Sequence, residues 1–294
     1  MRFKILLLLL LSVWSVNASA QLTLARCEEQ FLKENYSLLA AQYNVDAANA
    51  AIIQARIWEN PYIGAELNAI NPDAHKNFDI GPAGQKSYYI QQLIYLGGKK
   101  KNEVKLAKTN AEISALDFQD LQRNLKLSLR KSYFAVYFNN NSIKALDFQL
   151  ANLDSLIRAF DIQVKKGNLP LRDLVRLQSL YVNILNDRTQ LNSANLDEMK
   201  NIRIMLPSLT EFEPQPTTEE ITLYEKEIGQ TVDALIQTAL TTRPDLLAAQ
   251  KSVDAAQFNL KWQKALAIPD LTVGGSYDQH GGAFHDQIDV TLGI

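Results

Sequence analysis

The chain contains Leu38-Leu39-Ala40-Ala41-Gln42 and, shortly afterwards, Val45-Asp46-Ala47-Ala48. Both segments return as Leu246-Leu247-Ala248-Ala249-Gln250 and Val253-Asp254-Ala255-Ala256, at a constant offset of 208 residues from Leu38 to Leu246. Pro61 and Pro269 keep this offset, and each precedes a stretch of alternating apolar and polar residues. Solenoid repeats span only about 20–50 residues. The pattern therefore predicts a duplicated module in which a helix is followed by strands.

The N-terminus has the three parts of an export signal. Arg2 and Lys4 are basic, residues 5–16 are apolar, and Ala18-Ser19-Ala20 forms a small-residue cleavage site. The apolar part is shorter than the roughly 20 residues that a bilayer-crossing helix needs. We therefore predict a signal peptide at residues 1–20. A membrane anchor is the alternative, and the polar residues that follow at once disfavour it.

The composition restricts the class of protein. A net charge of −2 gives no basic footprint for nucleic acid. Cys27 is the only cysteine, so no internal disulfide can form. No later stretch has 18 unbroken apolar residues. An exported chain of this kind is periplasmic, secreted, or inserted in an outer membrane as a β-barrel.

The first copy of the module begins with a predicted helix and a strand pair. Residues 22–58 are rich in alanine and contain neither glycine nor proline, which favours a helix. Residues 61–95 contain the strand pair. Its first strand alternates apolar and polar residues over 63–69, with period two. The second strand covers 87–95, and the turn-rich residues 71–84 between them predict a loop.

Residues 99–206 predict a long helical hairpin. No glycine or proline interrupts the chain between Lys99 and Gly167, which allows roughly 100 Å of helix. Gly167 ends the outgoing helix and Pro170 begins the return helix. Apolar residues spaced alternately three and four apart form a coiled-coil seam, which Arg188 interrupts. The seam residues are Ile143, Leu146, Leu150, Leu153, Ile157, Phe160 and Val164, then Leu174, Leu177, Tyr181, Ile184 and Leu191.

The remainder of the chain predicts a connector and the start of the second copy. Residues 207–230 contain three prolines and form the connector, or equatorial segment. Residues 231–294 repeat the helix, up to about Leu266, and a strand pair at 270–294. No second hairpin follows. We therefore expect the remainder of the second copy to be missing from this C-terminally truncated sequence.

Four strands of about 8–10 residues, apolar on one face and polar on the other, suit a transmembrane β-barrel. The predicted lipid-facing residues are Ile63, Leu67, Val273, Ile288, Val290 and Leu292. The predicted lumen-facing residues are Glu66, Asn68, Asp289 and Thr291. Four strands cannot close a barrel, so several chains must contribute. A small sheet on a soluble core is the alternative, and it fits poorly with helices of roughly 100 Å.

Three local motifs resemble the TolC-type outer-membrane efflux protein family. Asn60-Pro61 resembles the family's entrance to the first strand. Gln91-Gln92-Leu93-Ile94-Tyr95-Leu96-Gly97-Gly98-Lys99-Lys100 resembles its strand-end segment, with Gln92 in place of a proline. Gly167-Asn168-Leu169-Pro170-Leu171-Arg172-Asp173-Leu174 resembles its hairpin tip. The order of elements over residues 21–294 agrees, and Leu96-Gly97-Gly98-Lys99 looks most like the CzcC/CusC cation-efflux branch.

The resemblance implies a fold and a set of partners. The fold would be an α+β membrane protein in which four strands per chain, shared in a homotrimer, form a transmembrane barrel. Long antiparallel coiled-coil helices would continue it as a periplasmic α-barrel. The channel would lie in the outer membrane and serve a periplasmic adaptor (a membrane fusion protein) and an inner-membrane pump, with the RND type favoured. The implied adaptor-binding residues are Gly167, Asn168, Leu169, Pro170, Leu171, Asp173 and Leu174.

Other functions have less support in the sequence. His280 and His285 flank a glycine pair without helical ligand spacing or a thiolate partner, so we expect no metal site. Gly97-Gly98-Lys99 lacks the spacing of a phosphate loop. No set of nucleophile, base and orienting residue indicates an enzyme, and no cofactor is expected. Two alternatives stay open: a periplasmic structural or adaptor-like coiled-coil protein, and the exit duct of a type I secretion system.

Overall fold

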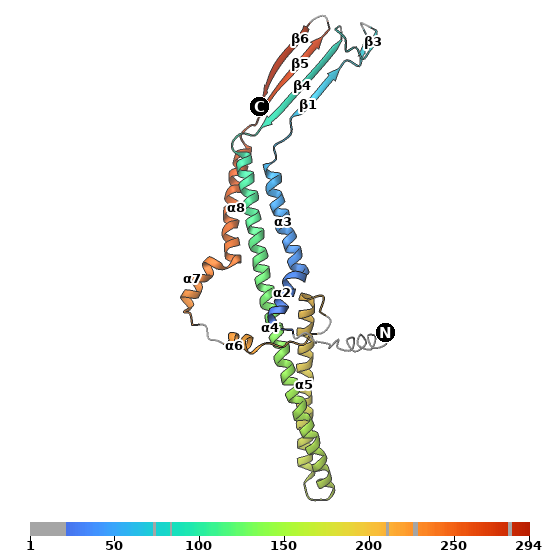
Figure 1. The fold of residues 1–294 in the computed structure, drawn as a ribbon, viewed down its shortest axis with the longest axis vertical. Helices are drawn as coiled ribbons and strands as arrows, with labels where there is room; N and C mark the ends of the chain where they lie inside the picture. The colour runs from blue at the N-terminus through green and yellow to red at the C-terminus, as the bar shows by residue number, and fades with distance from the viewer. Residues whose placement is uncertain (1–21, 73–74, 83, 210–211, 226–228, 282–283) are drawn as a thin grey trace, which may run out of the picture. The chain divides into compact units, whose positions relative to one another are not determined.

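A computed structural model describes residues 22–72, 75–82, 84–209, 212–225, 229–281 and 284–294. The predicted signal peptide at residues 1–20 lies outside this described part. The chain divides into two compact units. The first comprises Met1–Ala40 and Leu121–Val232, and the second comprises Ala41–Asp120 and Asp233–Ile294. Figure 1 labels the helices and strands.

The second unit contains a four-stranded antiparallel sheet. Its strands are β1 (Tyr62–Leu67), β4 (Gln85–Ile94), β5 (Leu271–His280) and β6 (Phe284–Gly293), in that spatial order. The first two strands come from the first copy of the module and the last two from the second. Pairing of β4 with β5 therefore joins the copies into one sheet (Figure 1).

The segment between β1 and β4 differs from the prediction. Residues 71–84 were expected to form only a loop, but β2 (Ile70–Asn71) and β3 (Lys76–Asn77) pair as a short antiparallel ribbon. Two residue pairs suffice for this ribbon, which is too short to produce a recognisable period-two pattern.

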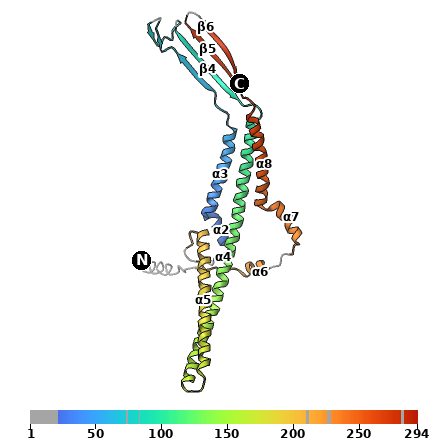
Figure 2. The same ribbon diagram turned by 180° about the vertical axis from the view of Figure 1, so that it is seen from behind.

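Three helices of the second unit lie side by side: α3 (Tyr36–Arg56), the first part of α4 (Lys99–Lys165) and α8 (Pro244–Leu266). Here α4 lies between α3 and α8 (Figure 2). Lys251 Nζ of α8 lies 2.5 Å from Glu112 Oε2 of α4. Small side chains let these helices approach closely. The buried alanines in the three helices are Ala55, Ala111, Ala248, Ala255 and Ala265.

The two predicted long helices at 22–58 and 231–266 are each broken once. The first consists of α2 (Leu24–Glu34) and α3, which meet at Asn35. The second consists of α7 (Val232–Thr242) and α8, which meet at Arg243. The starts of α2 and α3 map onto those of α7 and α8 at the offset of 208 residues found in the sequence. The duplication thus extends to the position of the break.

The causes of the two breaks differ. Asn35 Oδ1 accepts a hydrogen bond of 3.1 Å from the Leu38 backbone N–H, so its side chain caps α3. Asn35 Nδ2 also donates to the Met205 carbonyl at 3.2 Å. At the second break, Pro244 occupies the first turn of α8. Proline is favoured there and restricts the preceding Arg243 to extended backbone.

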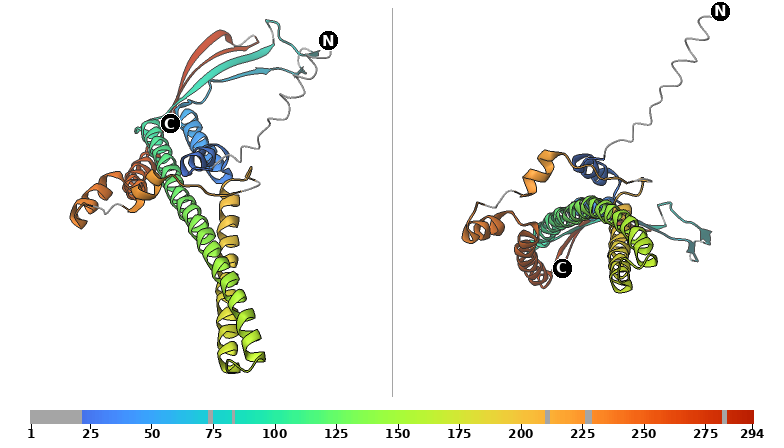
Figure 3. Two further views of the ribbon diagram at one scale, coloured as in Figure 1. Left: turned by 60° about the horizontal axis from the view of Figure 1, so that its bottom comes forward. Right: turned by 90° about the horizontal axis from the view of Figure 1, so that it is seen from below.

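The first unit contains the helical hairpin formed by the latter part of α4 and by α5 (Leu171–Met205), as Figure 3 shows. Every predicted seam residue is buried or half-buried, so the coiled-coil prediction is confirmed. Arg188 sits in the seam, and its Nε donates to Asp147 Oδ1 at 3.0 Å. Asn195 is buried in the same seam, and its Nδ2 donates to Asn140 Oδ1 at 2.8 Å.

The core of the first unit lies where α2 joins the hairpin. The largest fully buried side chains there are Phe31, Leu129, Tyr133, Val136, Ile202, Leu206 and Cys27. The hydroxyl of Tyr133 donates to the Leu22 carbonyl at 2.8 Å. Burial raises the pKa of the Cys27 thiol to about 12, so this cysteine stays protonated and packs as a small apolar residue.

A charged cluster ties α2 to α4 beside this core. Glu28 accepts from Arg130 Nε at 2.5 Å, and Lys126 Nζ lies 2.7 Å from its other carboxylate oxygen. Burial alone would raise the pKa of Glu28, but the hydrogen bonds from Arg130 and Lys126 outweigh burial and lower it.

The predicted connector also contains a helix, α6 (Thr218–Glu225). Thr217 and Glu220 form a capping box at its start. The Thr217 hydroxyl accepts from the Glu220 N–H at 3.1 Å, and a Glu220 carboxylate oxygen accepts from the Thr217 N–H at 2.9 Å.

Over the described ranges, no helix combines the length and apolar composition needed to cross a membrane. The α+β composition, with a four-stranded sheet and a long hairpin, is confirmed.

Candidate functional site

The register of the sheet decides which side chains share a face. Paired residues in antiparallel strands lie on the same side. One row joins Ile63 to Ile90, Gly275 and Val290. The next row joins Ala65 to Tyr88, Tyr277 and Ile288, while Val273 pairs with Leu292. All six predicted lipid-facing residues therefore lie on one face, which we call the apolar face.

The opposite face is mainly polar, and Tyr62, Tyr89 and Leu93 are its large apolar or aromatic side chains. One row joins Glu66, Ser87, Asp278 and Gln287, and another joins Gln91, Gly274 and Thr291. Asp289 pairs with Ser276 on the same side. Asn68 follows β1, and its backbone N–H continues the ladder by donating to the Gln85 carbonyl at 3.0 Å. The four predicted lumen-facing residues thus fall on the side opposite the apolar face.

The apolar face is open in the single chain. Ile63 is 75% exposed, Ile288 79% and Val290 78%. Soluble proteins rarely expose a contiguous apolar surface of this kind, and such surfaces mark membrane or protein contacts. The polar residues on this face lie toward the strand ends: Lys86 and Gln279 share a row with Leu67 at one end, and Gln92 pairs with Val273 at the other. The Gln92 amide donates to the backbone carbonyls of Glu59 and Leu93, both at 3.0 Å.

Two glycines permit close packing on the polar face. A Cβ at Gly64 would lie 2.3 Å from the ring of Tyr89, so this ring lies directly over the glycine. A Cβ at Gly274 would lie 2.6 Å from Thr291 Oγ1 and 2.7 Å from the Ile90 carbonyl. Because these two residues have no Cβ, the Tyr89 ring and the Thr291 side chain can lie directly against the sheet backbone on the polar face.

Gly97 and Gly98 form the turn between β4 and α4, where the sequence predicted that the strand ends and the helix begins. Gly97 and Gly98 both have positive φ, at 68° and 77°. A Cβ at Gly97 would lie 2.6 Å from Ile268 Cδ1, so glycine is required there by space as well as by backbone conformation. Lys99 then begins α4 and pairs with Asp270. Sequence reasoning missed this pair because no local pattern links the two residues.

The hairpin tip is a compact turn. The N–H of Gly167 donates to the Val164 carbonyl and the N–H of Asn168 to the Gln163 carbonyl, both at 2.9 Å. With φ of 77° at Gly167, this is a Schellman motif at the end of α4. The Asn168 side chain also donates to Gln163 Oε1 at 2.8 Å.

The predicted tip residues differ in exposure. Leu171 is 63% exposed, whereas Leu174 is only 4% exposed and belongs to the coiled-coil seam. Asp173 lies in the first turn of α5, where its charge is favourable at the helix N-terminus, and Arg172 and Arg176 lie nearby. Leu171 is therefore the apolar side chain that the tip offers most openly, while Leu174 holds the hairpin together.

In the part of the chain that the structure describes, His, Cys, Asp and Glu side chains form no group of three or more that could hold an ion. His280 Nε2 lies 2.8 Å from Gln85 Nε2 across the β4–β5 pair.

Comparison with known proteins agrees with this geometry. Residues 28–201, more than half of the chain, match the family model described as "Outer membrane efflux protein". The cobalt-zinc-cadmium resistance protein CzcC of Cupriavidus metallidurans is 21% identical over 262 residues. The alignment covers 89% of this chain, and the chain spans 59% of the length of CzcC.

Solved structures share the fold. CusC, described in connection with transmembrane channel formation, has a TM-score of 0.71 at 13% identity over 94% of this chain and 66% of CusC. The outer-membrane channel OprN has a TM-score of 0.69 at 17% identity over 92% of this chain and 63% of OprN. The sheet, the hairpin, the family match and the likeness to CzcC and CusC lead to one conclusion: the chain belongs to the outer membrane efflux protein family.

Proposed function

We propose that this protein is the outer-membrane channel component of a tripartite efflux system. It passively exports substrates that an inner-membrane pump, of the RND type, hands over through a periplasmic adaptor. The sheet with one apolar and one polar face carries this proposal. Its apolar face fits the bilayer and its polar face fits a water-filled lumen.

The sheet also supports a homotrimer. An open edge strand inside a bilayer leaves backbone groups without partners, at a cost of several kcal/mol each. β1 and β6 are the two edge strands of this sheet. Pairing β6 of one protomer with β1 of the next would remove both edges. Three protomers would supply twelve strands.

The cargo we favour is a divalent metal cation, because CzcC is named for cobalt, zinc and cadmium resistance. Drugs are the second cargo class. The lumen-facing carboxylates Glu66 and Asp289 provide negative charge along a cation path. A channel needs weak sites of this sort rather than a chelating cluster, because bound cargo must also leave.

A deletion strain tests the function directly. Loss of the gene should raise sensitivity to cobalt, zinc and cadmium salts, and the wild-type gene should restore resistance. The protein should fractionate with outer membranes and crosslink as a trimer. Unchanged metal sensitivity with unchanged drug sensitivity, or recovery of the protein in the soluble periplasmic fraction, would contradict the proposal.

A further inference from the structure

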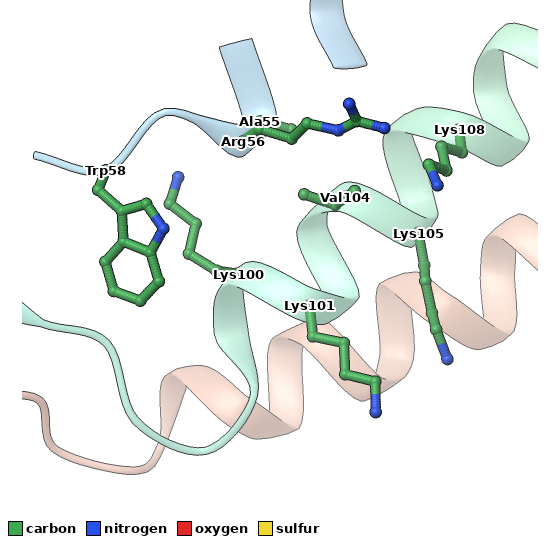
Figure 4. Close-up of a pocket in the computed structure, with 8 residues that line it drawn as sticks. All are labelled: Ala55, Arg56, Trp58, Lys100, Lys101, Val104, Lys105 and Lys108. Atoms are coloured by element: carbon green, nitrogen blue, oxygen red, sulfur yellow. The ribbon is translucent and has the colours of Figure 1, made fainter. Parts of the chain in front are cut away.

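A groove of about 390 Å³ lies between the end of α3 and the first turns of α4 in the second unit. Ala55 and Arg56 from the end of α3, Trp58 from the following segment, and the first turns of α4 line it (Figure 4). The α4 contribution consists of Lys100, Lys101, Val104, Lys105 and Lys108. The turn between β4 and α4 explains why glycine occupies positions 97 and 98, but it does not explain why lysines follow them.

The groove concentrates positive charge without acidic side chains in its lining. Lys101, Lys105 and Lys108 recur at helical spacing on one side of α4, where like charges repel. Lys100 is paired with Glu103 at 3.0 Å, and Lys105 Nζ lies 5.4 Å from the centroid of the Phe258 ring of α8. Among the described residues, neither Lys101, Lys108 nor Arg56 makes an ion pair. Glu112, the next acid along this side of α4, is already paired with Lys251. An anionic ligand would relieve this repulsion.

Aromatic side chains mark one end of the groove. The Trp58 ring lies 5.8 Å from the Tyr95 ring, directly after the end of β4, and Trp58 is half exposed. Lys100 Nζ lies 5.3 Å from the Tyr95 ring centroid. In membrane barrels, aromatic rings of this kind lie at the level of the lipid headgroups. The basic groove therefore begins where the membrane strands end.

We propose that this groove binds the phosphate of an anionic membrane phospholipid. Arg56 and Lys108 would contact the phosphate, Lys101 and Lys105 would add positive charge on the neighbouring side of α4, and Trp58 would contact the glycerol and upper acyl region. Basic pockets at a membrane boundary bind phospholipid headgroups in this way. The N-terminal end of α4 adds partial positive charge. This inference rests on the proposed function in one respect, the placement of the strands in a bilayer.

A titration in neutral detergent tests the site without requiring membrane insertion. The probes are dihexanoyl phosphatidylglycerol, dihexanoyl phosphatidylcholine and inorganic phosphate, with binding followed by calorimetry on the full chain. The test variant combines K101Q, K105Q and K108Q. The control variant combines K144Q, K166Q and K200Q, which removes the same charge from exposed lysines of the first unit. Unchanged circular dichroism verifies that both variants fold.

We expect the wild type and the control to bind phosphatidylglycerol at least tenfold more tightly than phosphatidylcholine. Each lysine near an anionic headgroup contributes about a fivefold factor in affinity. The test variant should therefore lose about tenfold to a hundredfold. Equal binding of the two lipids, or equal phosphatidylglycerol affinity in both variants, would overturn the site. Inorganic phosphate binding as tightly as phosphatidylglycerol would identify a free-anion site and overturn the lipid assignment.

A separate measurement tests membrane insertion of the sheet independently of lipid binding at the groove. Flotation with vesicles of pure phosphatidylcholine reports whether the apolar face of the sheet enters a bilayer. Failure to float would contradict the membrane location while leaving the detergent titration valid. Flotation together with a negative titration would contradict the lipid site alone.

Discussion

Lys99 Nζ lies 2.6 Å from Asp270 Oδ1, which links the first residue of α4 to the residue that precedes β5. The same carboxylate oxygen accepts the Leu96 N–H at 3.0 Å across 174 positions of sequence. Lys99 is buried and Asp270 is half-buried. A single carboxylate of the second copy therefore fixes the turn between β4 and α4 of the first.

This pair predicts a specific pH dependence of stability. The hydrogen bond and charge of Lys99, together with the Leu96 N–H, hold the pKa of Asp270 below its ordinary value. A carboxyl with a lowered folded-state pKa contributes stability above its unfolded pKa, about 3.9, and loses it as pH falls through the folded value. Thermal unfolding should therefore show D270N less stable than wild type at pH 7, with the difference shrinking toward pH 3.

The control for this experiment removes the partner. In a K99M background, D270N should change the pH dependence much less, because the charge that lowers the pKa is gone. If D270N lowered the melting temperature equally at pH 7 and pH 3, the ionised pair would have no part in the stability of the turn.

Because the sheet has an apolar and a polar face, we expect the same substitution at two adjacent residues of β6 to have different effects. Val290 lies on the apolar face and Thr291 on the polar face. An arginine facing lipid near the bilayer midplane costs about 2–4 kcal/mol, whereas a lumen-facing arginine contacts water. V290R should therefore reduce the folded, outer-membrane fraction much more than T291R. Heat-modified gel mobility measures this fraction, and equal losses in the two variants would contradict the facing.

Replacing Gly97 by alanine should destabilise the fold for two separable reasons. The alanine would adopt a positive-φ backbone conformation, which costs about 1–2 kcal/mol. Its Cβ would also clash with the side chain of Ile268. Gly167 has the same backbone conformation but no atom within 4 Å of its Cβ position. G97A should therefore lower the melting temperature more than G167A, each kcal/mol corresponding to about 2–4 °C. Adding I268V should recover part of the loss in G97A, and an absence of recovery would show that Ile268 causes no clash.

The sequence predicts the parts of this fold that depend on periodicity. Period two identified the apolar residues of β1, β5 and β6, and the three–four spacing identified the seam. The strand β4 resisted this approach because Gln91 and Gln92 fall on opposite faces. Its register with β5 resolves the facing, and Gln92 is accommodated by two backbone carbonyls at the strand end.

Other features were readable but required a different signal. Pro244 indicates a helix boundary at Arg243, and the 208-residue offset carries this boundary back to Asn35. Thr217 and Glu220 have the spacing of a capping box, which indicates α6. Local sequence patterns could not predict the pairing of Lys99 with Asp270 or the assembly of the basic groove. Both depend on contacts between residues far apart in the sequence.

The last prediction concerns the hairpin tip. The Schellman turn at Gly167 and the fixed backbone of Pro170 hold the loop in one conformation, so little entropy is lost when a partner docks. Leu171 is exposed there, whereas Leu174 is buried in the seam. L171D should leave trimer formation intact but reduce both adaptor crosslinking and efflux. L174D should instead unfold the hairpin and lower trimer yield, because it buries a charge in an apolar seam.

Exposed positions away from the tip supply the control for the docking test. Val182 is 61% exposed on α5, so V182D introduces the same charge at a comparable apolar position beyond the tip. If only the tip binds the adaptor, V182D should crosslink to the adaptor as wild type does. If the tip residues merely close a turn, L171D should retain normal crosslinking and normal efflux, and that result would remove Leu171 from the partner-binding surface.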